Sequence, residues 1–101
     1  MIIQQLESIK ERFEEVSQQS TMPKLVTDMD KFKKISKEYR DLEKIVVEFD
    51  KYKLLLANLD EAKDIIANEK DEEMRDMAKM ELEELVPKKA EMENQLKEML
   101  I

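Results

Sequence analysis

A heptad pattern of apolar residues through the middle of the chain constrains its fold more than any other feature. The apolar positions alternate steps of three and four residues from Phe32 to Ile66, with one irregular step at Tyr52 or Lys53. Such spacing is typical of a helix that packs along a narrow seam, as in a coiled coil. We therefore predict a single long helix over residues 28–68, about 60 Å in length at the usual rise per residue.

Two shorter amphipathic segments flank the long one. Residues 2–19 and 72–100 carry apolar side chains at steps of three and four, which predicts a helix in each. Thr27, with a carboxylate three residues later, is similar to a capping box at the start of the long helix, and Asp71 is a suitable N-cap for the last one. Pro87 lies inside the last segment, so we expect a kink or a break there because proline removes a backbone hydrogen bond.

These segments predict an all-α fold, an antiparallel three-helix, coiled-coil-like bundle with a long central helix. The two shorter helices are both expected to lean on the central one. Additional apolar residues widen the central stripe, as a second partner helix would require. They are Ile45, Val47, Leu54, Leu55 and Ile65. The 101 residues include no glycine, which the turns of β and α/β folds commonly need.

The composition also excludes several classes of function. A chain without glycine cannot form a glycine-rich phosphate-binding loop, and one without cysteine or histidine lacks the usual zinc ligands and the catalytic triads built on these residues. The net charge of -7 gives an overall field that does not attract nucleic acid. The longest uncharged apolar run, residues 54–57, is too short to span a bilayer, and the first residues do not resemble a signal peptide. We expect a soluble, cytoplasmic, non-enzymatic protein without a cofactor.

Carboxylates and methionines are the first two candidate sites. Neighbouring carboxylates could bind a divalent cation or transfer protons, but they lie off the apolar stripes and are better interpreted as a solvated face. They are Glu7, Glu11 and Glu14 on one helix and Glu69 and Glu73 near another. Methionines are abundant in the last helix, where they can form an adaptable binding surface or, as we favour, fill the core. They are Met74, Met77, Met80, Met92 and Met99, of which Met80 is the best candidate for exposure.

A basic stripe early in the long helix is the third candidate. Its members follow steps of four, three and four residues, so they share one face and could contact RNA phosphates or an acidic protein surface. They are Lys33, Lys37, Arg40 and Lys44, with Lys31 and Lys34 nearby. Asp41 and Glu48 lie one turn beyond Lys37 and Lys44, and pairing with them would make the stripe an ordinary charged face. The sequence leaves both interpretations open.

Two stretches go beyond a generic coiled coil. Residues 28–46 read DMDKFKKISKEYRDLEKIV and residues 71–85 read DEEMRDMAKMELEEL. The first closely resembles the start of the long second helix in the N-terminal domain of the bacterial peptide chain release factor 1 family, and the second resembles the start of the third helix. Pro23 also falls where that family has a proline between its first two helices. The resemblance covers essentially the whole chain, although Pro87 departs from the uninterrupted charged run of the family.

The resemblance implies that residues 1–101 are the N-terminal helical domain of a longer factor. Such a factor directs termination at UAA and UAG with a Gly-Gly-Gln motif that promotes hydrolysis of peptidyl-tRNA and a Pro-x-Thr tripeptide that reads the stop codon. Neither motif occurs in this chain. The implied partners are the stalk base of the large ribosomal subunit, the other domains of the factor, and release factor 3 in members that use it, with no membrane and no direct stop-codon contact. The alternative is an autonomous coiled-coil adaptor or a prefoldin-like chaperone subunit.

Overall fold

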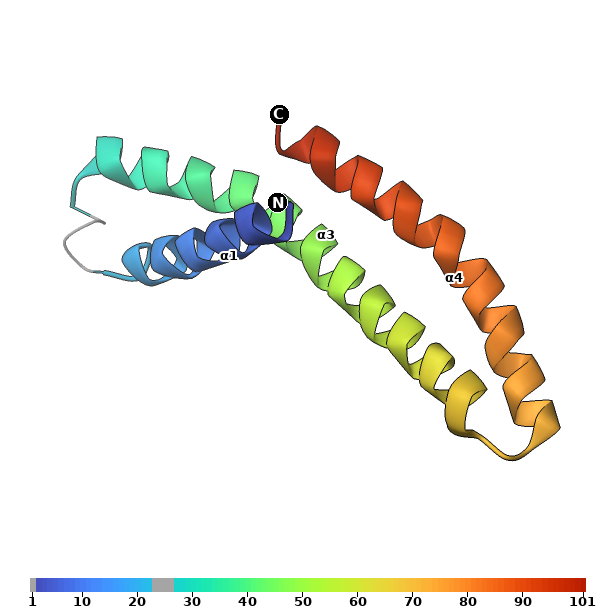
Figure 1. Cartoon of the computed structure of the whole chain (residues 1–101). Helices are drawn as coiled ribbons and strands as arrows, with labels where there is room; N and C mark the ends of the chain where they lie inside the picture. The colour runs from blue at the N-terminus through green and yellow to red at the C-terminus, as the bar shows by residue number, and fades with distance from the viewer. Residues whose placement is uncertain (1, 23–26) are drawn as a thin grey trace. The chain divides into compact units, whose positions relative to one another are not determined.

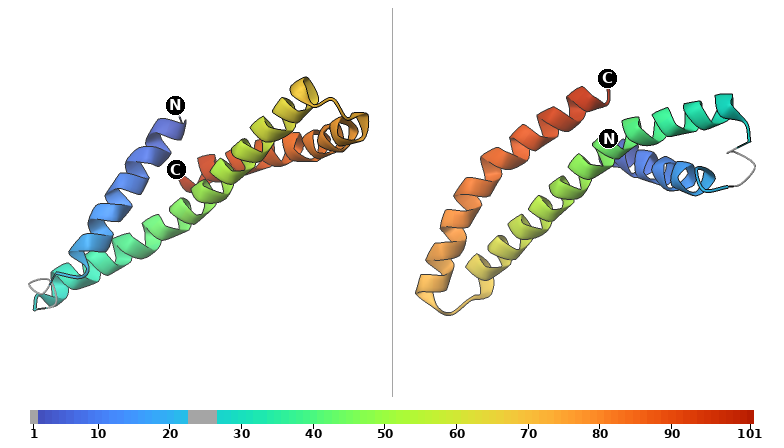
Figure 2. Two further views of the ribbon diagram at one scale, coloured as in Figure 1. Left: turned by 90° about the horizontal axis from the view of Figure 1, so that it is seen from below. Right: turned by 180° about the vertical axis from the view of Figure 1, so that it is seen from behind.

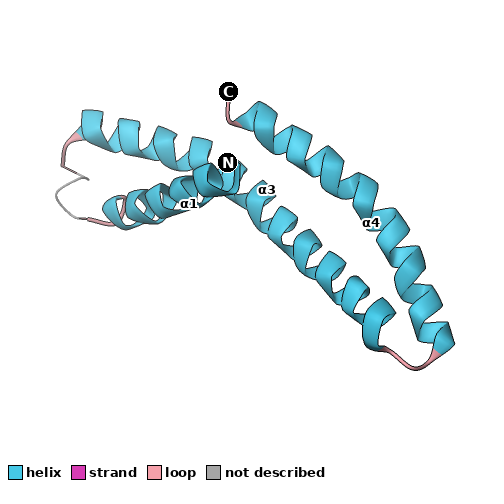
Figure 3. Ribbon diagram, in the orientation of Figure 1, coloured by secondary structure: helices cyan, strands magenta, loops and turns pink. Residues whose placement is uncertain are grey.

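The computed structural model describes residues 2–22 and 27–101, and in these residues it contains three α-helices and no strand (Figure 1). The helices are α1 (Ile2–Gln19), α3 (Met29–Asn68) and α4 (Glu72–Met99), and a short loop joins α3 to α4 (Figure 3). The predicted all-α class is confirmed, and every helix bound lies within one residue of its predicted position. No helix in this part of the chain is both long enough and apolar enough to cross a membrane.

The chain divides into two compact units, Met1–Phe49 and Asp50–Ile101. The first unit is a hairpin of α1 and the beginning of α3, and the second is a hairpin of the rest of α3 and α4 (Figure 2). In each hairpin the two helices run antiparallel. The expectation that both shorter helices lean on the long one is therefore confirmed, with each of them using its own part of α3.

Carboxylates at the helix starts explain where α3 and α4 begin. The Asp28 carboxylate accepts a hydrogen bond from the backbone N–H of Lys31 at 3.2 Å, so it satisfies a donor in the first turn of α3. The sequence suggested Thr27 as the N-cap of α3, whereas in the structure the capping carboxylate belongs to the next residue, Asp28. Asp71 is the N-cap of α4, as predicted, and its carboxylate accepts from the N–H of Glu73 at 3.0 Å.

The first unit buries a small apolar core. The rings of Phe13 on α1 and Tyr39 on α3 contact each other with centroids 5.0 Å apart and planes inclined by 31°. An ion pair joins the same two helices, because Arg12 donates to both carboxylate oxygens of Glu38 at 2.6 and 3.0 Å. Other side chains of this unit are almost completely buried, and each is worth about 1.5–3 kcal/mol of transfer free energy. They are Leu6, Val16, Val46 and Phe49.

The second unit buries an apolar seam between α3 and α4. This seam shows which residue occupies the irregular step of the heptad pattern. Tyr52 rather than Lys53 is buried, and the next buried position is Leu55. Leu59 and Ala62 are buried as the predicted stripe requires, whereas Leu55, which was expected only to widen the stripe, takes the seam position after Tyr52 in place of Leu56. The side chains of α4 cover α3 at residues 52, 55, 59 and 62, which follow steps of three, four and three. The buried residues of this unit are Tyr52, Leu55, Leu59 and Ala62 on α3 and Ala78 and Leu96 on α4.

The proline in α4 does not break the helix. Pro87 lies inside a helix that runs from Glu72 to Met99, and its side chain is exposed. Figure 2 shows α4 bowed along its length rather than interrupted. A bend is the usual response of a helix to a missing backbone hydrogen bond and a crowded preceding turn. The expected kink thus takes the form of a bow, and the alternative of a break was wrong.

Candidate functional site

The basic stripe lies on one face of α3 in the first unit. All four of its side chains are exposed, as a contact surface requires: Lys33, Lys37, Arg40 and Lys44. The Arg40 guanidinium donates to the backbone oxygen of Ser36 at 3.4 Å, which holds it along the helix. The helix therefore presents four cations over about three turns, a geometry that suits a row of phosphates or carboxylates.

A shallow hollow of about 460 Å³ accompanies the stripe on one flank. It is lined by Lys33 and Arg40 together with Phe32, Ser36 and Tyr39. Phe32 is 37% exposed, although its heptad position predicted a core residue. The aromatic rings of Phe32 and Tyr39 therefore lie beside the cations of the stripe. Aromatic rings can stack on a nucleic-acid base or on an arginine side chain.

Two of the carboxylates between the stripe residues, Glu38 and Glu43, interact with groups outside the stripe. Glu38 binds Arg12 of α1, and this hydrogen-bonded pair lowers the pKa of the Glu38 carboxyl below its usual value. A hydrogen bond to Glu43 raises the pKa of the Tyr39 hydroxyl, so the Glu43 carboxylate is turned toward that ring. Within residues 27–49, no ion pair joins Lys37 to Asp41. Lys37 therefore remains available to a partner.

Lys31 and Lys34 do not extend the stripe. They line a different hollow of the first unit, together with Gln19 of α1 and Ile35 of α3. Residues 31 and 34 lie 100° or more around the helix from residue 33, whereas the four stripe residues stay within a narrow sector. The basic stripe therefore keeps the four members given by the sequence: Lys33, Lys37, Arg40 and Lys44.

The carboxylates considered for catalysis or metal binding are spread over exposed helix surfaces. Glu11, Glu14 and Glu73 are all exposed, while Glu69 is half-buried. The Glu69 carboxylate accepts from the backbone N–H groups of Lys70 and Asp71 at 3.1 and 3.2 Å, so it orders the turn before α4. In residues 2–22 and 27–101, no group of three or more acidic side chains is placed to hold a metal ion.

The methionines of α4 divide into two sets. Met92 and Met99 are half-buried, which agrees with a role in the seam. Met74, Met77 and Met80 are 46%, 70% and 67% exposed, so core filling was the wrong interpretation for these three, although the exposure of Met80 was predicted. They follow the turn, where α4 has only the last turns of α3 beside it, and part of its surface therefore has no neighbour to bury it.

One partly buried polar contact was not predicted from the sequence. The Tyr52 hydroxyl donates to the Glu93 carboxylate at 2.8 Å, and Lys89 Nζ lies 3.8 Å from the same oxygen. Burial, and then the bond to Glu93, raise the pKa of Tyr52 to about 12. The only signal was a tyrosine at the irregular step of an otherwise aliphatic seam. The contact joins α3 to α4 within the second unit.

The family model and the similar known proteins indicate the same family. The family model of the PCRF domain matches residues 9–101 of the chain. Peptide chain release factor 1 of Cytophaga hutchinsonii is 40% identical over 99% of this chain and 28% of its own length. The same factor of Flavobacterium johnsoniae is 37% identical over 99% of the chain and 28% of its own length, and that of Bacteroides fragilis is 38% identical over 99% and 27%. The chain thus spans little more than a quarter of these curated relatives. No solved structure matches it.

Proposed function

The chain belongs to the peptide chain release factor 1 family, and from this premise we propose that it acts as the helical domain of such a factor in translation termination. The observation that carries the proposal is the match of the PCRF domain over residues 9–101, together with 40% identity to a named release factor over nearly the whole chain. The long helices with largely exposed surfaces suit a domain that makes contacts. Within residues 2–22 and 27–101, no group of acidic side chains is placed to hold a metal ion.

The proposed division of labour follows from what the chain contains. It has no glycine, so the Gly-Gly-Gln motif and the hydrolysis of peptidyl-tRNA must belong to other domains of the factor. Reading of UAA and UAG belongs to those domains too. This domain would pack on them in the cytoplasm and reach the stalk base of the large ribosomal subunit, where release factor 3 can act in members that use it.

A domain exchange tests this proposal directly. The matching segment of Cytophaga hutchinsonii peptide chain release factor 1 is replaced by residues 1–101, and release of formyl-methionine is measured on ribosomes programmed with UAA or UAG. We expect the hybrid to restore most of the release rate lost when the segment is deleted, with no release from residues 1–101 alone. A hybrid that folds and binds ribosomes but performs no better than the deletion would contradict the proposal.

The surface that we propose for the ribosome is the basic stripe of Lys33, Lys37, Arg40 and Lys44. Its support is the exposure of all four cations and the engagement of Glu38 with Arg12, which leaves the face locally positive on an acidic chain. A local positive face attracts phosphates or carboxylates within about 10 Å at moderate salt, even where the net charge of the chain is negative.

Charge reversal tests the stripe. In the hybrid factor, Lys33→Glu/Lys37→Glu/Arg40→Glu is compared with Lys79→Glu/Lys88→Glu/Lys97→Glu, which makes the same charge change at three exposed sites of α4. For a phosphate contact, ribosome affinity should fall in the first variant alone, and the slope of log affinity against log salt should decrease by roughly one per lost contact. Equal affinity of the two variants at every salt concentration, with unchanged melting temperatures, would eliminate the stripe.

A further inference from the structure

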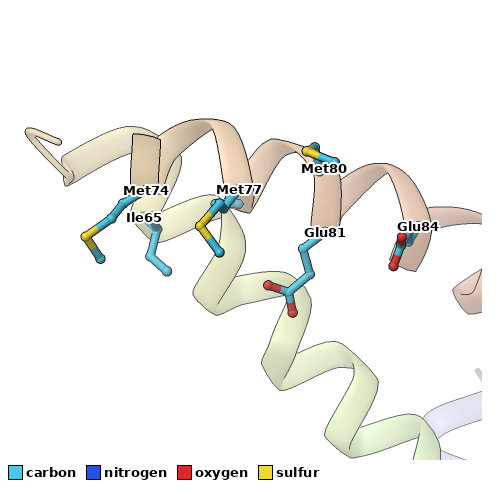
Figure 4. A pocket seen from close by; sticks show the side chains of 7 residues that line it. Ile65, Met74, Met77, Met80, Glu81 and Glu84 are labelled. Carbon is cyan, nitrogen blue, oxygen red and sulfur yellow. The ribbon is translucent and has the colours of Figure 1, made fainter. Parts of the chain in front are cut away.

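An apolar groove lies in the second unit beside the turn between α3 and α4. It has a volume of about 430 Å³ and is lined by Ile65 of α3 and by Met74, Met77, Ala78, Met80, Glu81 and Glu84 of α4. Figure 4 shows Ile65, Met74 and Met77 grouped near the turn, with the carboxylates of Glu81 and Glu84 following along α4. The groove is thus apolar at the turn and acidic at the other end.

The methionines of this groove are exposed, although another face of α4 is covered by α3. Met77 and Met80 are 70% and 67% exposed, while Ala78 between them is only 3% exposed. Contiguous apolar surface on a water-soluble helix commonly marks an interaction site. Methionine suits such a site because its unbranched, polarizable side chain adapts to the shape of the surface that it meets.

Charge indicates which kind of surface the groove accepts. Residues 72–84 carry six carboxylates against two cationic side chains. One of these cations, Arg75, is directed to the turn, where its guanidinium donates to the backbone oxygens of Glu69 and Lys70 at 3.0 and 3.4 Å. Arg75 therefore does not neutralise Glu81 or Glu84. Two copies of the chain would repel each other if their acidic grooves met, whereas a cationic partner would be attracted.

We propose that this groove binds a basic amphipathic helix of a partner protein. The apolar face of that helix would pack on Ile65, Met74 and Met77, with Met80 at the edge of the groove (Figure 4). Lysine or arginine side chains beside that face would pair with Glu81 and Glu84. Helices bind grooves in this way through apolar anchors at positions i, i+3 or i+4, and i+7. The proposal goes beyond the function proposed above and does not depend on the basic stripe, which lies in the first unit and has the opposite charge.

A model peptide tests the groove in the intact chain. The probe is an 18-residue helix of leucine and lysine with one apolar face, and the matched control replaces each lysine by glutamate. With ¹³C-methyl-labelled methionine, we expect the methyl signals of Met74, Met77 and Met80 to shift on adding the Leu/Lys peptide, while those of Met22 and Met29 stay in place. Shifts spread over all methionines, or equal binding of the Leu/Glu peptide, would overturn the proposal.

Paired substitutions then measure separately how the apolar part and the acidic part of the groove contribute to binding. Fluorescence anisotropy should show roughly tenfold weaker binding of the Leu/Lys peptide to Met77→Gln/Met80→Gln. The control Met22→Gln/Met29→Gln, at two other exposed methionines, should bind like the parent. Glu81→Gln/Glu84→Gln should weaken binding and reduce its dependence on salt, unlike Glu11→Gln/Glu14→Gln on α1. Groove variants that bind like their controls would overturn the proposal. So would a dimer of the chain alone that Met77→Gln/Met80→Gln abolishes, because a second copy would then occupy the groove.

Discussion

Substitution of Tyr52 by phenylalanine should destabilise the second unit through the loss of one hydrogen bond. The Tyr52 side chain is 3% exposed, and its hydroxyl donates to Glu93 at 2.8 Å. Hydrogen bonds to charged groups contribute about 1.5–3 kcal/mol. In the variant, the Glu93 carboxylate would still lie 3.8 Å from Lys89 Nζ, and its side chain is 31% exposed. Water and Lys89 can therefore compensate for part of the lost hydrogen bond. We therefore expect the low end of this range, about 1.5 kcal/mol, with a melting temperature lower by roughly 6–12 °C for a chain of this size.

Circular dichroism at 222 nm, followed against temperature and urea, measures this loss. Tyr39→Phe is the matched control, because the Tyr39 hydroxyl faces Glu43 at the surface while its ring keeps contact with Phe13. A double-mutant cycle of Tyr52→Phe with Glu93→Gln isolates the coupling between the two side chains. A Tyr52→Phe variant as stable as the parent, or no more affected than Tyr39→Phe, would refute the argument that this bond stabilises the hairpin.

The pH dependence gives an independent check on the same contact. The pKa of Tyr52 is raised from its usual value of 10 to about 12, so above pH 10 the unfolded chain releases a proton that the folded chain retains. The stability of the parent must then fall as pH rises from 10 toward 12. Between pH 9 and pH 11, the disadvantage of Tyr52→Phe relative to the parent should shrink by about 1.3 kcal/mol. A difference that does not change over this interval would show that Tyr52 ionises equally in both states.

Substitutions at three further positions test the start of α4, its bow and the first unit. Pro87→Ala should raise the melting temperature by restoring a backbone donor to α4, with a gain of about 1–3 kcal/mol, and a less stable variant would contradict this. Asp71→Ala should cost about 1 kcal/mol in urea unfolding and Asp71→Asn much less, because asparagine also caps; equal losses would remove the cap argument. Because Arg12 lowers the pKa of Glu38, the stability from this pair is present above the usual pKa of 4.5 and is lost as pH falls through the lower folded value. Glu38→Gln should therefore lose less stability than the parent between pH 5 and pH 2, and identical acid profiles would argue against the pair.

The helices were predictable because their signals are local. The steps of three and four residues around Phe32–Ile66 require only the geometry of one helix, and Asp71 caps α4 through its own backbone neighbours. The lack of glycine, cysteine and histidine excluded glycine-rich phosphate loops, the usual zinc sites and the triads built on cysteine or histidine without reference to any contact. The sequence by itself therefore determined the all-α class, the helix bounds to within one residue and the release factor family.

The tertiary structure decided which residues of each stripe are buried against, or bonded to, a neighbouring helix. Leu55 rather than Leu56 is buried, Glu38 finds Arg12 26 residues away, and Tyr52 finds Glu93 41 residues away. The methionines beside the turn lie on a face of α4 that α3 leaves exposed. Helical periodicity gives the direction of a side chain from its own axis, whereas burial depends on which side chains the neighbouring helix brings to that place. For this reason the basic stripe could be outlined from the sequence, while the groove beside Met77 emerged only from the packing of two helices.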